Sequence, residues 1–165
     1  MELILDACTL IKGMIQKSGP ERQLVDYIQA GDAKLVVSQE AITEYIYAPY
    51  KIFVEAIRSG RIKDYNRELN NAYYISNRLA KILNYNSRLV NVYSKVNIIE
   101  EDEADNKFIN LAIDSKIYIL VSNDTHITGI KDKLLDLHNI EVLSPMDAVF
   151  EISKQKLKKK FSMKP

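Results

Sequence analysis

Cysteine is almost absent from this chain of 165 residues, which carries a single one, Cys8. One thiol cannot form an intrachain disulfide or build a cysteine-rich zinc site, so we expect a reducing, cytoplasmic setting. No apolar run approaches the roughly 18 residues that a membrane span requires, and no charged-then-apolar signal segment begins the sequence. These absences predict a cytoplasmic protein without a membrane partner.

Charge of one sign is not in excess overall, since 23 Lys and Arg stand against 22 Asp and Glu. The lysines are unevenly placed, however, and six of them crowd into residues 154–165, which leaves the rest of the chain acidic. We therefore expect a single domain over 1–153 and a basic C-terminal tail over 154–165. Such a tail on an acidic body would steer nucleic acid, although a solvated terminus explains it equally well.

Short apolar runs alternate with helical patterns along most of the chain. This rhythm predicts a three-layer α/β/α fold with a central parallel sheet of about four or five strands. A helix that begins after Ser38 is expected to end before Pro49. Residues 50–88 predict two further helices, rich in tyrosine, that form a helical insertion. Its tyrosines are expected to be core or interface residues, although they could also stack on bases. The predicted strands cover 3–5, 34–37, 89–92, 96–99, 118–121 and 141–143.

Two predicted strands deliver an aspartate at or just beyond their carboxyl ends, namely Asp6 and Asp124. The carboxyl ends of parallel strands share one edge of a sheet, where ligands bind in open α/β folds. Either aspartate alone is also explained as a turn or helix-cap residue. Their pairing makes a shared site at this edge the more informative hypothesis.

Two further carboxylates could reach the same edge. Glu44 lies three residues after Ala41 in the helix that follows the second strand, where an ordinary exposed glutamate fits equally well. Near the start of a later helix, spacing does not choose between Asp102, Glu103 and Asp105, and Asp102 could cap that helix with Asp105 as its partner.

Five segments together resemble a known family, the PIN-domain ribonucleases, and they occur in that family's order. They cover the chain apart from the 50–88 insertion and the lysine tail. The segments are LDACTLI at 5–11, SQEAITE at 38–44, DEADNKF at 102–108, LVSND at 120–124 and VLSP at 142–145.

The resemblance implies a catalytic set of Asp6, Glu44, Asp105 and Asp124, of which Asp6, Asp105 and Asp124 bind metal. Asp105 is preferred over Asp102 because, with Ile109, it fits the family's pattern of Asp followed four residues later by an apolar residue. The implied activity is that of an endoribonuclease dependent on Mg²⁺ or Mn²⁺. The resemblance also implies the toxin of a toxin–antitoxin pair, with RNA as substrate, a small antitoxin protein as partner, and a homodimer.

The sequence departs from the family at two positions. Cys8 replaces a residue that is often small and polar, and His126 replaces a second aspartate. We expect His126 to be an exposed loop residue, although it could serve as a neutral metal ligand or a base. Thr9 and Ser122 are expected to support the site by orienting ligands or contacting phosphate.

Carboxylates at close quarters raise one another's pKa, and hard divalent cations relieve the conflict. The favoured hypothesis is therefore metal-dependent hydrolysis of RNA phosphodiester bonds. The alternative from another class is a catalytically silent domain of the same fold that binds RNA or a protein partner. An aspartyl-phosphate phosphatase ranks low because Cys8 stands where such enzymes usually carry a second acid. A nucleotide-binding oxidoreductase ranks lower still, since no Gly-x-Gly-x-x-Gly follows the first strand.

Overall fold

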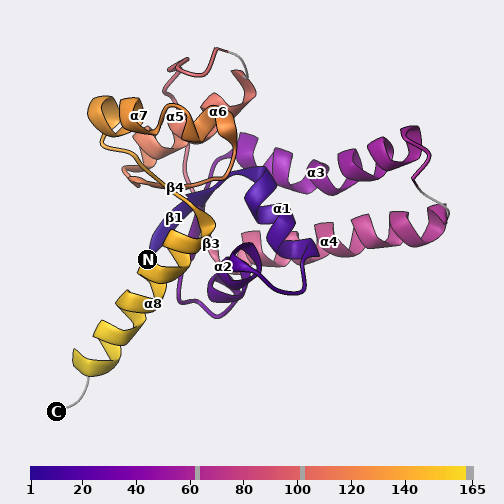
Figure 1. Cartoon of the computed structure of the whole chain (residues 1–165), viewed down its shortest axis with the longest axis horizontal. Coiled ribbons are helices and arrows are strands. Elements are labelled where there is room, and N and C mark those ends of the chain that lie inside the picture. Colours follow the sequence, from indigo (N-terminus) through magenta and orange to yellow (C-terminus); the bar gives the residue numbers. More distant parts are fainter. Residues whose placement is uncertain (62–63, 101–102, 163–165) are drawn as a thin grey trace.

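The computed structural model describes residues 1–61, 64–100 and 103–162. Five parallel strands form one sheet in the order β3-β2-β1-β4-β5, with helices on both sides (Figure 1). This arrangement confirms the predicted three-layer fold. The strands are β1 (Glu2–Leu5), β2 (Lys34–Val37), β3 (Ser87–Leu89), β4 (Ile119–Val121) and β5 (Glu141–Leu143).

The three central strands form the centre of the hydrophobic core, as their uninterrupted apolar runs predict. In β1 and β2 every residue after the first is buried, and β4 ends in two buried residues. The register places Leu5 of β1 opposite Val121 of β4. The residues that follow these two strands therefore emerge side by side at the carboxyl edge of the sheet.

From β1 the chain first adds β2 and β3 on one side of the sheet, and then adds β4 and β5 on the other side of β1. Because parallel crossovers are right-handed, the two sets of connections cover opposite faces, as Figure 1 shows. The order of the strands reverses between β1 and β4, which is where open α/β sheets form their ligand crevice. The first set comprises α1 (Ala7–Ile15), α2 (Pro20–Gln29), α3 (Gln39–Arg58) and α4 (Tyr65–Tyr85); the second comprises the 3-10 helix η1 (Glu103–Asp105), α5 (Asn106–Ser115), α6 (Thr125–Thr128) and α7 (Lys131–His138).

Helices α3 and α4 pack on each other as a hairpin that extends away from the sheet (Figure 1). The prediction that α3 ends before Pro49 is wrong, because α3 runs through this proline to Arg58. Pro49 is buried, and we attribute the continued helix to packing against α4 that offsets the lost backbone hydrogen bond. Tyr65, Tyr73, Tyr74 and Tyr85 are all exposed, so the prediction is wrong as far as it places them in the core.

The last helix, α8 (Pro145–Ser162), returns to the first face and packs against α2. Tyr27 of α2 hydrogen-bonds Ser153 at 2.9 Å, and Lys156 forms an ion pair with Asp32 at 2.6 Å. The helix continues without a break through the expected domain boundary at Lys154. The lysines at 154–160 therefore lie on a regular helix that projects from the body (Figure 1).

The segment between β3 and η1 differs from the two strands predicted there. Only Ser87–Leu89 pairs with the sheet, and residues 90–99 have no regular secondary structure. Separately, none of the helices in the described residues combines the length and the apolar character needed to cross a membrane.

Candidate active site

Asp6 follows β1 directly and is almost completely buried, with 3% of its surface exposed. Its backbone N–H donates to the carbonyl of Val121 at 3.1 Å, which extends the pairing of β1 with β4 by one residue. One carboxylate oxygen accepts a hydrogen bond from the backbone N–H of Thr9 at 2.5 Å, and the other accepts one from the Ser122 hydroxyl. Asp6 is therefore the N-cap of α1 and is also tied to the end of β4.

The Ser122 hydroxyl connects the two predicted aspartates. It donates to Asp6 and accepts from the backbone N–H of Asp124 at 2.9 Å. Asp124 in turn caps α6 by accepting from the N–H of His126 at 2.8 Å. Both aspartates thus act as helix caps, as their local sequence allows, and the cap role coexists with their meeting at one edge of the sheet.

The pKa of Asp6 is raised above its ordinary value of 3.8. Burial is the largest cause, and the negative charge of Asp124 adds to it. Hydrogen bonds from Ser122 and Thr9 act in the opposite direction, because they stabilise the ionised carboxylate. A cation placed between the two aspartates would therefore relieve both the burial penalty and the repulsion.

Cys8 lies in the first turn of α1, and the charges of all four predicted carboxylates act on the pKa of its thiol. Cys8 is exposed, but the protein around its sulfur still desolvates the thiolate and so raises the pKa of the thiol. The charges of Asp6, Asp124, Asp105 and Glu44 raise this pKa further, in that order. All four carboxylates thus lie within electrostatic reach of one sulfur atom. The structure brings the four predicted residues to the same region of the molecule.

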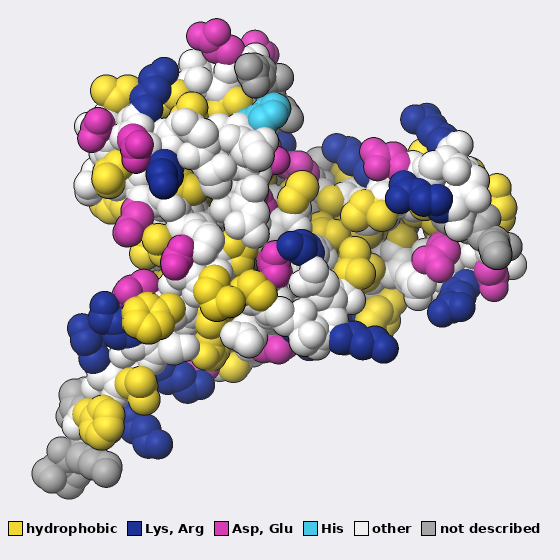
Figure 2. Space-filling model, viewed as in Figure 1, with side chains coloured by type: hydrophobic (Ala, Val, Ile, Leu, Met, Phe, Trp, Pro, Cys, Tyr) yellow, Lys and Arg dark blue, Asp and Glu magenta, His cyan; other side chains and the backbone are white. Residues whose placement is uncertain are grey.

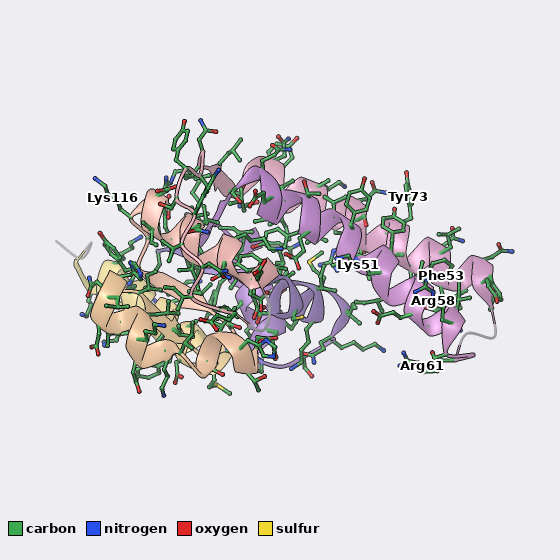
Figure 3. The ribbon with its side chains drawn as sticks, turned by 90° about the horizontal axis from the view of Figure 1, so that it is seen from above. Lys51, Phe53, Arg58, Arg61, Tyr73 and Lys116 are labelled. Atoms are coloured by element: carbon green, nitrogen blue, oxygen red, sulfur yellow. The ribbon has the colours of Figure 1, made fainter. Side chains whose placement is uncertain are left out.

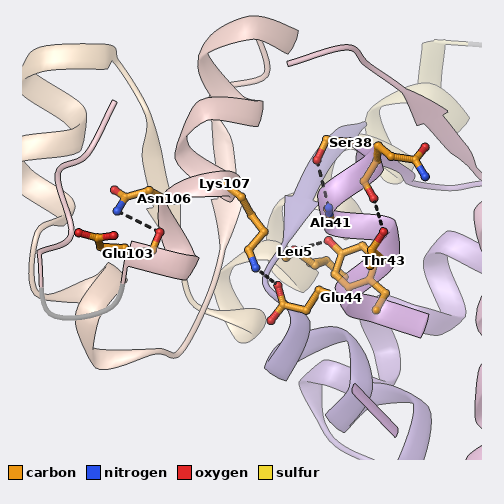
Figure 4. A network of polar contacts seen from close by, with 10 residues as sticks. Leu5, Ser38, Ala41, Thr43, Glu44, Glu103, Asn106 and Lys107 are labelled. Atoms are coloured by element: carbon orange, nitrogen blue, oxygen red, sulfur yellow. Dashed lines mark hydrogen bonds and ion pairs between the residues drawn. The ribbon is translucent and has the colours of Figure 1, made fainter. Parts of the chain in front are cut away.

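Glu44 reaches this region from α3 and forms an ion pair there with Lys107 of α5 (Figure 4). The neighbouring side chains hold the two helices in place. Tyr45 is completely buried, donates from its hydroxyl to the carbonyl of Leu5 at 2.5 Å, and stacks on Phe108 with ring centroids 6.1 Å apart. This aromatic contact fixes the backbone beside both partners of the ion pair.

Lys107 is the residue of the site that the sequence did not reveal. It is mostly buried, with 16% of its side chain exposed, and it places a positive charge among the carboxylates. Its position two residues after Asp105 was the available signal. Carboxylate spacing along the sequence indicates acidic ligands, but it does not indicate the cation that compensates their charge.

Asp105 is the last residue of η1 and stands at the N-cap position of α5, where its side chain makes no capping hydrogen bond. The alternative in which it reciprocates a cap from Asp102 involves a residue outside the described part of the chain. Asn106, the next residue, is 5% exposed, and its side chain holds the neighbouring backbone in place through hydrogen bonds. Its side chain accepts from the backbone N–H groups of Ile98 and Ile99 and donates to the carbonyl of Ile99. It also donates to the carbonyl of Glu103 (Figure 4).

Three polar side chains on one face of α5 hold residues 93–99 alongside the helix. Asn106 binds the backbone at 98 and 99, Asn110 binds both backbone groups of Val96, and Asp114 accepts from the N–H groups of residues 93 and 94. The spacing of four residues places these side chains in a row. This row replaces the strand pairing that the sequence predicted for 96–99.

His126 differs from its expected position in an exposed loop. It belongs to α6 and is partly buried, and its Nδ1 atom is buried without a hydrogen-bond partner in the described structure. A hollow of about 460 Å³ lies beside it, lined by Ile98, Ile99, Glu100, Thr125, Gly129 and Ile130 as well as the histidine. The exposed-loop prediction is wrong because Asp124 caps α6, and this short helix places His126 in a partly buried position.

The case for a metal ion at this site depends on the negative charge of the carboxylates, because the part of the chain that the structure describes does not surround the position with a full set of ligands. Within the described residues no three His, Cys, Asp or Glu side chains come close enough together to hold a metal ion. Mg²⁺ usually binds through one or two carboxylates and keeps several water ligands, so Asp6 and Asp124 satisfy its ordinary requirement. The negative charge of Asp124, which contributes to the raised pKa of Asp6, would also favour a cation beside these two carboxylates.

We expect Asn106→Ala to lower the free energy of unfolding by about 3 kcal/mol, because buried backbone groups at residues 98 and 99 lose their partners. Urea denaturation measures the loss, and Asn84→Ala on the exposed side of α4 is the control. A loss no greater than that of the control would show that the segment holds its position without Asn106.

We also expect Asp6→Asn to stabilise the metal-free protein at pH 7, on the order of 1 kcal/mol. Asparagine is an equally good N-cap, and the substitution removes a buried charge whose folded-state pKa is raised. The wild-type penalty develops as the pH rises from 3.8 through that raised pKa, so the difference should vanish near pH 3. Urea denaturation in chelator at both pH values tests this, and equal stability at pH 7 would contradict it.

Comparison with known proteins agrees with this geometry. A family model described as PIN domain matches residues 2–126, a span that runs from β1 into α6 and includes all four carboxylates. Neither a curated protein nor a solved structure gives a significant match to the chain. PIN domains are generally nucleases and typically depend on divalent metal ions. The chain therefore belongs to the PIN-domain family.

Proposed function

We propose that this protein is a metal-dependent endoribonuclease that hydrolyses RNA phosphodiester bonds. The observation that supports it most directly is the hydrogen-bonded connection from Asp6 through Ser122 to Asp124, at the point where the strand order reverses. Glu44 and Asp105 lie close enough for their charges to act on the thiol of Cys8 beside them. Bound Mg²⁺ or Mn²⁺ would supply an activated water and would stabilise charge on the phosphate and the leaving oxygen.

The protein's own residues would bind the metal ion and fix the positions of its ligands. Asp6 and Asp124 are the primary ligands in this proposal, and Asp105 and Glu44 would complete the set through water molecules. Ser122 orients Asp6 through its hydroxyl and fixes the backbone of Asp124. The rigid attachment of these ligands to β1 and β4 would keep their geometry constant during turnover.

An acidic site repels RNA, so cations elsewhere must hold the substrate. The α3–α4 hairpin supplies them, because Lys51, Arg58 and Arg61 are exposed and lie along it (Figure 3). The exposed ring of Tyr73 is available on the same hairpin for stacking on a base. Since α3 also carries Glu44, one helix would connect the substrate-binding surface to the site.

The resemblance to PIN-domain ribonucleases also supports a more specific biological role. We propose that the nuclease is the toxin of a toxin–antitoxin pair, controlled by a small partner protein. A cytoplasmic location is part of this proposal, and it is supported by the single exposed thiol of Cys8 beside the site, which a reducing compartment would preserve.

A second candidate is a catalytically silent domain that binds RNA or a protein partner. The ion pair between Glu44 and Lys107 favours it, because the lysine already neutralises one of the four carboxylates. Metal binding distinguishes the two candidates, since a silent domain needs no cation at Asp6 and Asp124.

Purified protein incubated with mixed RNAs and Mn²⁺ should cleave them, and chelator should abolish the cleavage. Asp6→Asn should lower the rate of RNA cleavage at least a hundredfold, because it replaces a metal ligand without removing the helix cap. It should also abolish the heat of Mn²⁺ binding measured by calorimetry. Asp132→Asn on the exposed surface of α7 is the matched control. Full activity in Asp6→Asn would overturn the assignment, and a wild type without Mn²⁺ binding or cleavage would favour the silent domain.

Lys107→Met should strengthen Mn²⁺ binding about tenfold, because it removes a positive charge from the carboxylate cluster and releases Glu44. Isothermal titration calorimetry measures the affinity, with Lys133→Met on α7 as the exposed control. An affinity equal to that of the control would mean that the metal does not experience the charge of Lys107.

A further inference from the structure

Helix α8 carries two sets of apolar side chains, and the body of the protein covers only one of them. Ala148, Val149 and Ile152 are buried against the core. A second set, the outer stripe, consists of four large side chains that are exposed: Met146 (60%), Phe150 (64%), Leu157 (56%) and Phe161 (68%). At 3.6 residues per turn the outer stripe follows one line along the helix and faces away from the buried set.

The outer stripe reaches into the part of α8 that projects from the protein. In Figure 1 the C-terminal half of α8 extends beyond the body, and Figure 2 shows hydrophobic side chains beside lysines along it. A shallow hollow of about 490 Å³ runs along the helix between Phe150, Leu157 and Phe161. A flat surface can therefore reach the outer stripe on this half of the helix.

Lysines border the outer stripe on both sides in the projecting half. Residues 153–162 contain five lysines and neither Asp nor Glu. At 3.6 residues per turn, Lys154 and Lys158 fall on one flank of the stripe, and Lys156 and Lys160 fall on the other. All four side chains are exposed. A lysine in such a position can lay its apolar stem along an apolar surface while its ammonium group stays in the polar layer above it.

Nearby acidic groups balance only part of this positive charge. Lys154 pairs with Glu151 at 3.2 Å, and Lys156 pairs with Asp32 at 2.6 Å. The lysines at 158–160 lie farther along the helix than both of these pairs. The projecting half of α8 therefore carries a net positive charge beside its apolar side chains.

We propose that the outer stripe docks on the surface of a membrane that contains anionic lipids. Phe150, Leu157 and Phe161 would enter the boundary between headgroups and acyl chains, and the flanking lysines would contact the lipid phosphates. An apolar line with lysines along its polar borders is the pattern of a helix that lies in the plane of a bilayer interface. The lysines select the lipid class, because each one beside an anionic surface strengthens binding roughly fivefold.

Interfacial docking does not need the long apolar run whose absence led us to predict a protein without a membrane partner. A helix that lies on the surface enters only the outer layer of the bilayer, so a few large apolar side chains on one side of it are sufficient. The proposal therefore departs from that prediction, and it does not depend on the nuclease proposal.

Single-stranded RNA fits the outer stripe less well. Its phosphates would suit the lysines, and its bases could stack on Phe150 and Phe161. Leu157, which lies between these two rings along the stripe, offers no aromatic face and would stay uncovered. A bilayer covers all three side chains, because its apolar layer is continuous and sets no spacing.

Vesicle flotation tests the docking. With vesicles of phosphatidylcholine that contain roughly one third phosphatidylglycerol, the wild type should bind with an association constant on the order of 10⁴ M⁻¹, the strength of one weak anchor. The double variant Leu157→Ser/Phe161→Ser should bind at least tenfold more weakly, because it removes two apolar anchors and leaves every lysine in place. Leu137→Ser, at a residue of α7 that is 62% exposed, is the control. A wild type that does not float, a double variant that binds as well as the wild type, or an equal loss in the control would overturn the proposal.

Vesicles of pure phosphatidylcholine test the lipid class, and the wild type should bind them at least tenfold more weakly than the anionic vesicles. The double variant Lys158→Gln/Lys160→Gln should lower the affinity for anionic vesicles about tenfold, and it should leave the weak affinity for neutral vesicles unchanged. Equal binding of the wild type to both kinds of vesicle would contradict the role given to the lysines and overturn the proposal for anionic lipids.

A tryptophan reporter tests whether the outer stripe enters the bilayer. The chain has no tryptophan, so Phe161→Trp provides a single one. Its emission should shift to shorter wavelengths with anionic vesicles, and lipids brominated on their acyl chains should quench it. The emission of the control variant Leu137→Trp should not change. A reporter that binds vesicles without a shift or quenching would show that only the lysines adsorb, and it would overturn the docking of the stripe.

RNA binding by the same variants, measured in chelator to prevent cleavage, tests the competing occupant. A loss of RNA affinity in Leu157→Ser/Phe161→Ser, together with no vesicle binding by the wild type, would assign the outer stripe to RNA and overturn the proposal. Unchanged RNA affinity in this variant is the expected result. Because none of these measurements needs metal or cleavage, a failure of the nuclease proposal would leave them unaffected.

Discussion

The parallel pairing of β1 with β4 is the contact on which the candidate active site depends. It places Asp6 level with Ser122, and the serine hydroxyl then connects the Asp6 carboxylate to the backbone of Asp124. Two aspartates separated by more than a hundred residues are joined by one buried side chain. The strand order reverses here, which is the position at which open α/β sheets form their ligand crevice.

Electrostatic repulsion between the carboxylates at this edge of the sheet helps to explain the raised pKa values of the site and the presence of Lys107. Burial and the charge of Asp124 raise the pKa of Asp6, and the thiol of Cys8 responds to all four carboxylates. Lys107 compensates part of this charge through its ion pair with Glu44. The remaining negative charge is the condition under which a divalent cation binds, so the same residues that cost stability would provide the proposed chemistry.

Helix α5 organises the side of the site that the sheet does not reach. Its first turn carries Lys107, its buried face carries Phe108 against Tyr45, and its polar row beginning at Asn106 holds residues 93–99. Side-chain amides thus perform the role that strand pairing performs elsewhere in the fold. Asp105 stands directly before this helix, and its position follows from how α5 is anchored.

The sequence by itself determined β1, β2, β4 and β5, their alternation with helices and the placement of Asp6 and Asp124 at strand ends, because buried strands need short apolar runs and helices need caps. It did not reveal Lys107, the row at Asn106 or the passage of α3 through Pro49. Each of these depends on a partner far away in the chain, which spacing along one element cannot indicate. The meeting of four carboxylates at Cys8 was likewise decided by the tertiary structure, because charge repulsion acts only between groups that folding has brought together.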